Sequence, residues 1–226
     1  MIGGKLVERE LEEILIKRII IFDFLRRAYF WEFPTELFIE AINYAKRANG
    51  MNTNVMPEKL FFEYNQIADS KTILEIYHEI KIEYTRLFVG PRHLPSPPYA
   101  SVYMDKNRLM MQQETLDVRQ AYLNDGLRIL NFNQEPDDHI GTEMEFMYVL
   151  NHKAIDAFRN NDKVALSEVV STQIHFSKEH MVNWIPNFCD DILQSSKNSF
   201  WKNVAIFTKQ VIQEDVNNLM IIKSSI

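Results

Sequence analysis

The residues from Glu83 to Tyr103 constrain the fold of this chain more than any other segment. Their sequence is EYTRLFVGPRHLPSPPYASVY. Four prolines stand within the eight residues from Pro91 to Pro98. Because proline fixes φ and lacks a backbone N–H, this stretch is excluded from a helix interior. We expect a stiff, partly polyproline-like crossing segment that holds aromatic side chains in place.

The rest of the chain has the periodicity of helices. Apolar residues such as Leu11, Leu15 and Phe22 recur at three- and four-residue steps between charged residues. No strand-like alternation is sustained. The pattern predicts an all-α protein of about eight to ten helices. The expected helices cover about 5–31, 34–48, a short segment after Pro57, 70–89, 109–123, a long helix from 136, 164–184 and 199–222.

Length and composition predict one globular domain. The chain has 226 residues, of which 46% are hydrophobic and 25% charged. A subdivision near residues 90–105 or 126–136 is left open. Cys189 is the only cysteine, so an intramolecular disulfide is excluded and a reducing compartment is expected. The net charge of −6 argues against nucleic acid as a partner. No apolar run reaches the ~18 residues of a membrane span, so we expect a cytoplasmic protein that does not insert into a membrane.

The pair Arg26-Arg27 resembles the arginines of a twin-arginine export signal. Such a signal continues into an uncharged apolar run. Here Glu32, Pro34 and Glu36 interrupt that run. The pair is therefore interpreted as part of a solvated helix face.

An acidic cluster stands at residues 135–143, where the sequence is EPDDHIGTE. Either aspartate could simply cap a helix N-terminus. The sharper interpretation is that one aspartate caps while its neighbour and His139 face a groove. His139 and Glu143 are one helical turn apart, and such a group could receive guanidinium groups.

Enzymatic and metal-binding alternatives rest on fewer residues. His139, Glu143 and Glu75 could serve a helical metal- or cofactor-handling enzyme. Glu75-x-x-His78 resembles half of a di-iron site, but such sites need two motifs of this kind and only one occurs. No nucleophile elbow, phosphate loop or dinucleotide motif is present.

Four motifs in order resemble the TorD/DmsD/NarJ family of redox-enzyme maturation chaperones. They are Tyr84-x2-Leu87-Phe88-x-Gly90-Pro91, then Leu94-Pro95-x-Pro97-Pro98-Tyr99-x-Ser101-Val102-Tyr103, then Glu135-Pro136-Asp137-Asp138-His139-Ile140 with Glu143, and finally Phe176-x3-His180-x3-Trp184-x3-Phe188. Together they cover nearly half of the chain. Tyr99 stands where the DmsD branch commonly has tryptophan.

The resemblance implies an all-helical, cytoplasmic, non-catalytic protein with no cofactor of its own. Its partners would be the twin-arginine signal peptide and the apo form of a molybdopterin enzyme, which it would hold back from export until the cofactor is inserted. The resemblance implies a monomer or a domain-swapped dimer. The signal-binding residues carried over from the family are Leu87, Phe88, Pro97, Pro98, Tyr99, Ser101, Val102, Tyr103, Asp137, Asp138 and His139.

The chemistry of these residues suits such a peptide. Asp137 or Asp138 could pair with its arginines, and Tyr99 and Tyr103 could stack on guanidinium faces. Leu87, Phe88 and the prolines would form an apolar wall. We expect replacement of both aspartates by asparagine to weaken peptide binding without unfolding the protein. A scaffold protein in which the proline segment only packs the fold remains a further alternative.

Overall fold

The computed structural model describes residues 7–48, 70–91, 93–128 and 136–226. Within these ranges the chain forms nine α-helices and two π-helical turns, with one isolated β-bridge. The elements are α1 (Glu8–Phe30), α2 (Thr35–Ala48), α3 (Ser70–Tyr84), η2 (Thr85–Val89), α4 (Ala100–Met104), α5 (Gln113–Asn124), α6 (Ile140–Arg159), α7 (Lys163–Phe176), η3 (Ser177–Met181), α8 (Ile185–Ser195) and α9 (Ser199–Ser225). The all-α prediction is confirmed. Among the described helices, each is too short or too polar to cross a membrane.

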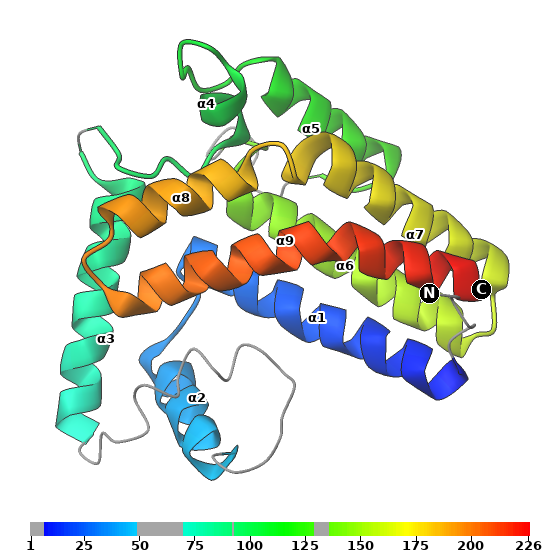
Figure 1. The fold of residues 1–226 in the computed structure, drawn as a ribbon, viewed down its shortest axis with the longest axis horizontal. Coiled ribbons are helices and arrows are strands. Elements are labelled where there is room, and N and C mark those ends of the chain that lie inside the picture. Colours follow the sequence, from blue (N-terminus) through cyan, green and yellow to red (C-terminus); the bar gives the residue numbers. More distant parts are fainter. Residues whose placement is uncertain (1–6, 49–69, 92, 129–135) are drawn as a thin grey trace.

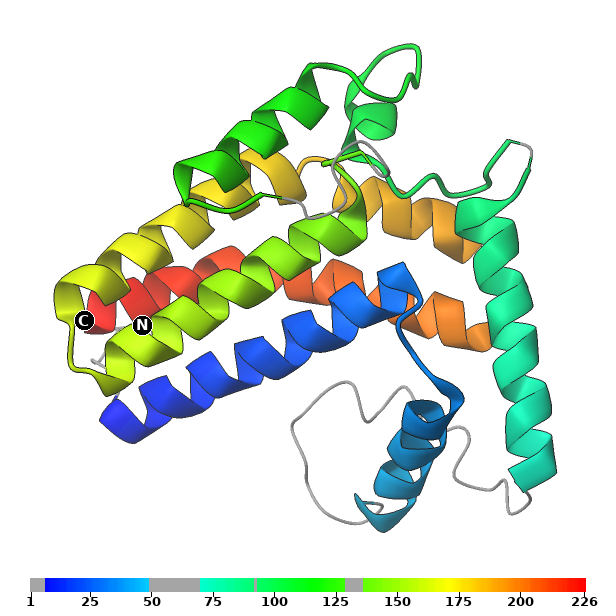
Figure 2. The same ribbon diagram turned by 180° about the vertical axis from the view of Figure 1, so that it is seen from behind.

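Four long helices form the body of the molecule. Figures 1 and 2 show α1, α6, α7 and α9 running along its longest dimension, with α6 packed on α1 and on α7. α8 packs on α9, and α3 stands across the end where α8 finishes and α9 begins (Figure 1). α4 and α5 lie on the opposite side of the bundle from α2.

Aromatic side chains fill the core where α1, η2, α8 and α9 meet. The ring of Phe88 lies 5.0 Å from Trp201, 5.8 Å from Phe188 and 6.2 Å from Tyr29, measured between centroids. The pairs with Trp201 and Tyr29 are edge-to-face, and such pairs add to the free energy gained from burying the rings. Leu87 is fully buried beside them. The end of η2 is therefore fixed in the core, and the proline segment leaves from a rigid point.

Two expected helices begin later than the sequence predicted. α5 begins at Gln113 and not at residue 109, because Arg108 and Met111 take left-handed φ values of 56° and 58°. α6 begins at Ile140 and not at residue 136. The backbone just before Ile140 is instead engaged with the proline segment.

Two corrections concern the C-terminal half. The expected helix 164–184 ends at Phe176 and continues as the π-helical turn η3. The sequence pattern did not predict helix α8, which begins one residue before Pro186. This proline lies in the first turn of α8, where a missing N–H leaves no helical hydrogen bond unmade. The short helix expected after Pro57 lies outside the described residues.

Candidate functional site

The end of the proline segment is joined to the start of α6. The N–H of Ala100 donates to the carbonyl of Asp138 at 3.0 Å, and the N–H of Ile140 donates to the carbonyl of Pro98 at 2.9 Å. Tyr99 and His139 thereby form an antiparallel bridge. Two motifs about 40 residues apart in sequence thus meet in space.

Asp138 is fully buried and caps α4. Its carboxylate accepts hydrogen bonds from the N–H of Ser101 at 2.8 Å and from the hydroxyl of Thr115 at 2.9 Å. A carboxylate that receives N–H groups at a helix start stabilises that helix. The sequence predicted that an aspartate caps the helix that follows it, and this is wrong: Asp138 binds the start of α4, while His139 is the N-cap of α6.

Asp137 is paired with an arginine of the same chain. The Nε of Arg119 on α5 donates to its carboxylate at 2.9 Å, and the Asp137 side chain is only 6% exposed. The Tyr122 hydroxyl donates to the Asp137 carbonyl at 3.0 Å. Both interactions tie this residue to α5.

His139 is the N-cap of α6. Its Nδ1 accepts a hydrogen bond from the N–H of Gly141 at 3.0 Å, and its ring stacks on Phe30 with centroids 5.3 Å apart. Burial lowers the pKa of His139 to about 3. The imidazole is therefore neutral at pH 7, as its role as an acceptor requires.

Glu143 lies behind this cap and is fully buried. The indole N–H of Trp184 donates to its carboxyl group at 3.2 Å. Burial, assisted by the charge of Asp138, raises the pKa of Glu143 well above its usual value.

The metal-handling alternative is not supported. Glu75 lies exposed on α3, whereas Glu143 is fully buried on α6. Within the part of the chain that the structure describes, no group of three His, Cys, Asp or Glu residues is arranged to hold an ion.

Of the eleven residues predicted for the site, only Tyr99 and Tyr103 are partly exposed. The other nine are buried. They comprise the core pair from η2, two prolines, Ser101 and Val102 of α4, and the three residues before α6. Of the eleven residues, the two tyrosines are therefore those that reach the surface.

Tyr103 carries a polar cluster that the sequence did not predict. Its hydroxyl donates to the carboxylate of Asp191 on α8 at 3.1 Å, and the guanidinium of Arg108 lies over its ring, 5.1 Å from the centroid. Arg108 also donates to Asp191 at 3.0 Å. Burial, with the Asp191 charge, raises the pKa of Tyr103 well above its usual value, so the hydroxyl remains a donor.

A spacing in the sequence could have indicated Asp191. Trp184, Phe188 and Asp191 stand at positions i, i+4 and i+7, which is one face of a helix. Both aromatic rings of that face contact Tyr103, with centroids 5.7 Å and 6.1 Å away. Recognising α8 as a helix would have placed the carboxylate beside the predicted tyrosine.

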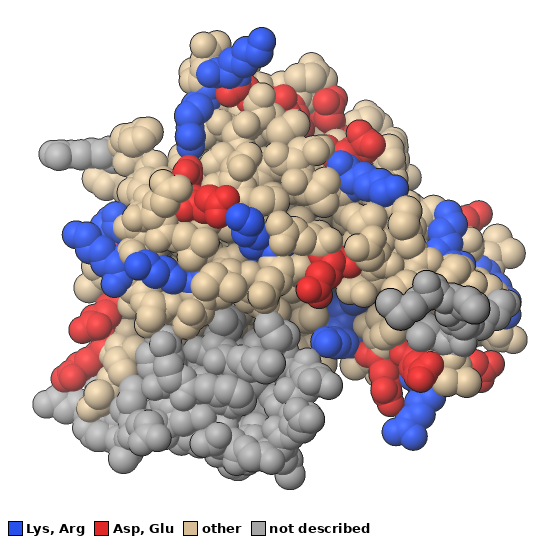
Figure 3. All heavy atoms as spheres, viewed as in Figure 1, with Lys and Arg blue, Asp and Glu red and all other residues tan. Residues whose placement is uncertain are grey.

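Charges of both signs are mixed on the face that carries α8. In Figure 3, Lys and Arg side chains stand next to Asp and Glu side chains, and neither sign covers that face alone. Recognition of a cationic group on this face would therefore depend on individual pairs and not on a broad acidic field.

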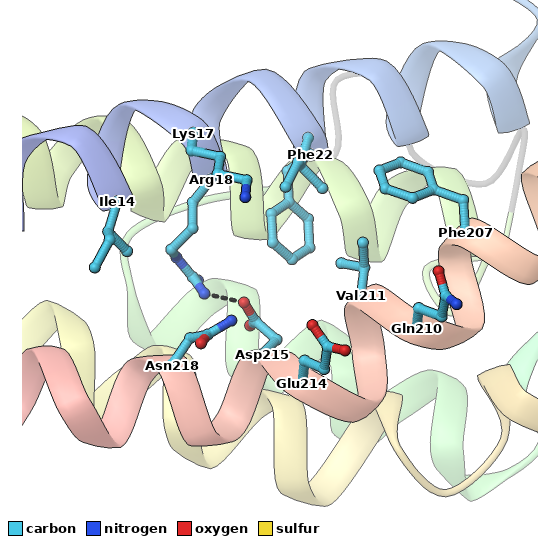
Figure 4. A pocket seen from close by; sticks show the side chains of 11 residues that line it. Ile14, Lys17, Arg18, Phe22, Phe207, Gln210, Val211, Glu214, Asp215 and Asn218 are labelled. Atoms are coloured by element: carbon cyan, nitrogen blue, oxygen red, sulfur yellow. Dashed lines mark hydrogen bonds and ion pairs between the residues drawn. The ribbon is translucent and has the colours of Figure 1, made fainter. Parts of the chain in front are cut away.

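A pocket of about 500 Å³ lies elsewhere, between α1 and α9. Figure 4 shows the ion pair of Arg18 and Asp215 in it, between apolar walls that include Ile14 and Phe207. None of the eleven predicted residues lines this pocket. It is therefore separate from the surface around Tyr103.

A comparison with known protein families matches the part of the chain that carries the four motifs. Residues 71–190 match the family described as nitrate reductase delta subunit. The chain is 27% identical over 137 residues to the chaperone protein TorD of Vibrio cholerae, covering 61% of this chain and 60% of the relative. It is 24% identical over 139 residues to the probable Tat proofreading chaperone DmsD of Haemophilus influenzae, covering 62% and 61%. The Tat proofreading chaperone DmsD of Salmonella paratyphi A is 40% identical over 57 residues, or 25% of this chain and 28% of that protein. The chain thus spans about three fifths of the length of the first two relatives.

Proposed function

We propose that this chain, which belongs to the nitrate reductase delta subunit family, is a chaperone for a twin-arginine leader. The family assignment confirms the resemblance to the TorD/DmsD/NarJ chaperones. Its client would be the apo form of a molybdopterin enzyme. The chaperone would act in the cytoplasm, before export, and would bind no nucleic acid. Its contribution is binding and not catalysis.

The observation that carries the proposal is the rigid presentation of Tyr99 and Tyr103. Backbone hydrogen bonds from the proline segment to Asp138 and Ile140 fix the segment that bears Tyr99, and the Asp138 carboxylate fixes the start of α4, which bears Tyr103. A surface that is ordered before binding loses little conformational entropy when a peptide arrives. Tyrosine rings also offer faces on which guanidinium groups can stack.

An apolar surface adjoins these tyrosines in the chain. Met104 and the loop residues Leu109, Met110 and Met111 are exposed, the last to 67%. Methionine adapts its shape to irregular apolar partners. We propose that this loop receives the hydrophobic part of the leader. Leu87 and Phe88 were expected to form the apolar wall, and both are buried in the core.

Asp137 and Asp138 stay predicted leader contacts. In the free protein their carboxylates are engaged by Arg119, Ser101 and Thr115. A leader arginine would have to replace one of those partners. We therefore assign the first contacts to the tyrosines and a supporting role to the two aspartates.

The test is a calorimetric titration of the full chain with a synthetic twin-arginine leader and with its Lys-Lys variant. Arginine offers a planar fork and a stacking face that lysine lacks. The proposal expects a Kd of about 1 μM or tighter for the leader, weakened at least about tenfold by the Lys-Lys change. Equal binding of the two peptides, or no binding of several leaders, would overturn it.

A further inference from the structure

Arg108 occupies a site that is built to hold a guanidinium group. Its planar group lies over the Tyr103 ring at 5.1 Å, and its Nη2 donates to Asp191 at 3.0 Å. The Tyr103 hydroxyl donates to the same carboxylate oxygen at 3.1 Å, which fixes the ring and the carboxylate relative to each other. The aromatic face can stack on the plane of a guanidinium group, and the carboxylate can accept its charged hydrogen bonds.

The loop that supplies Arg108 is held by Asp105. The Asp105 carboxylate accepts the N–H groups of Asn107 at 2.7 Å and Leu109 at 3.2 Å, and its carbonyl accepts the N–H of Arg108 at 3.1 Å. Arg108 has a φ of 56°, in the left-handed region that side chains other than glycine seldom adopt. The contact with Tyr103 is thus made from a less favourable backbone conformation.

The Arg108 pair is also the more accessible of two similar pairs. The side chains of Arg108 and Asp191 are 53% and 27% exposed. Exposed ion pairs contribute little net stability, because water and salt compete with them. The pair of Arg119 and Asp137 differs, since its carboxylate is 6% exposed and its arginine belongs to a helix. Arg108 is therefore the arginine that a ligand could displace.

We propose that Tyr103 and Asp191 bind an arginine side chain of the leader, and that Arg108 fills this site in the free protein as an internal substitute. This inference rests on the proposed function, because it takes a twin-arginine leader as the ligand. The exposed apolar residues that follow Arg108 place a hydrophobic surface next to the site. An arginine followed by an apolar run would find both features in that order.

The internal substitute lowers the apparent affinity for the leader, because binding must first release Arg108. The replacement Arg108→Ala removes this competitor and leaves the site intact. Asp191→Asn keeps the shape of the site and removes its charge. Arg159→Ala is the matched control, because Arg159 is 56% exposed, is paired with Glu12 at 3.0 Å and lies at the far end of the 20-residue helix α6.

The experiment titrates the full-length wild type and these three variants with the twin-arginine leader, at the same salt concentration. We expect Arg108→Ala to tighten binding about fivefold and Asp191→Asn to weaken it about tenfold. Arg159→Ala should bind as the wild type does, although it makes the same change in net charge. Thermal unfolding of each variant identifies any loss of binding that comes from misfolding.

The outcomes distinguish a failure of this inference from a failure of the proposed function. If the wild type binds the leader and Arg108→Ala binds it equally or more weakly, Arg108 does not compete with the leader. This inference is then wrong, and the chaperone proposal stands. If Arg159→Ala tightens binding as much as Arg108→Ala, the gain in affinity comes from the change in net charge. The assignment of the arginine site to Tyr103 and Asp191 is then wrong. If the wild type binds the leader, Arg108→Ala binds it more tightly and Asp191→Asn binds it more weakly, both proposals are supported. If wild type and variants all fail to bind, both are overturned.

Discussion

The carboxylate of Asp138 accepts the backbone N–H of Ser101 at 2.8 Å, across a separation of 37 residues. This bond attaches the first turn of α4 to the residue pair that precedes α6. Tyr103 lies two residues beyond Ser101 on the same short helix. The position of the tyrosine at the surface therefore depends on a carboxylate that is itself fully buried.

Replacing Asp138 by asparagine should destabilise the protein. The amide can still accept one of the two hydrogen bonds, but the charge that strengthens both is lost. A loss of about 1–3 kcal/mol in the free energy of unfolding is expected, measured by urea denaturation. Asp117→Asn on the exposed face of α5 is the control, with an expected change within about 0.5 kcal/mol.

This expectation changes the interpretation of the double aspartate variant. Asparagine at both 137 and 138 would also leave Arg119 without its carboxylate partner. Weakened leader binding would then have two sources, loss of contact and movement of α4. A stability curve measured beside the titration shows how far the fold itself is weakened, because loss of the charged Asp138 interactions lowers the unfolding midpoint.

Gly141 should not tolerate a side chain. A Cβ at this position would lie 2.9 Å from the Phe30 ring and 3.0 Å from Nδ1 of His139. We expect Gly141→Ala to cost about 1–3 kcal/mol, because the α6 cap and α1 would have to separate. The added replacement Phe30→Leu removes the obstructing ring edge and should recover part of that loss. If Gly141→Ala melts at the wild-type temperature, the Phe30 ring of α1 does not pack as closely on Gly141 as the structure shows.

Glu83 should make stability depend on acidic pH. Its carboxylate accepts hydrogen bonds from Arg86, from the Ser196 hydroxyl and from the N–H of Lys197, and so joins α3 to the link between α8 and α9. The Arg86 hydrogen bond is the largest cause that lowers the pKa of Glu83 to about 2. A lowered folded-state pKa stabilises the protein above the unfolded pKa of about 4.5, and this contribution is lost as the pH falls toward 2.

The measurement compares the wild type with Glu83→Gln between pH 7 and pH 2. The variant should be less stable by about 1–3 kcal/mol at pH 7, with the difference shrinking below pH 4.5. A difference that stayed constant down to pH 2 would show that the Glu83 charge does not contribute.

Sequence reasoning succeeded where a single residue type dictates local geometry. The prolines excluded helix between Pro91 and Pro98, and Gly90 ended the helical turn as expected. The apolar stripe of α1 predicted its buried residues, such as Leu15 and Phe22. These features depend on neighbours within a few positions, so they can be predicted from the local sequence.

Partners across the fold were not predictable in the same way. The sequence indicated that Asp137 and Asp138 were caps or ligands, but the groups that bind them come from α4 and α5. Asp191 and Arg108 meet only because α8 lies beside the α4–α5 loop, and α8 was missed. Contacts between residues more than 80 positions apart follow from packing, which periodicity does not specify.

The ion pair of Arg18 and Asp215 should be the most sensitive polar contact of the four-helix body. Both side chains are 5% exposed, and the Nε of Arg18 also donates to Asn151 at 3.0 Å. The Gln173 amide donates to the same Asn151 oxygen at 2.8 Å, so one network joins α1, α6, α7 and α9. Asp215→Ala should cost about 3–5 kcal/mol, because it leaves a buried guanidinium without its counter-charge.

The decisive comparison is with Arg18→Met combined with Asp215→Leu. Apolar residues of similar volume remove both charges, and they should recover most of the loss, because the desolvation cost disappears with the pair. The exposed pair of Arg159 and Glu12 is the control, where Glu12→Ala should change stability by less than about 1 kcal/mol. If the double variant is no more stable than Asp215→Ala, the network stabilises the bundle through its hydrogen bonds. The unpaired charge is then not the cause of the lower stability of Asp215→Ala.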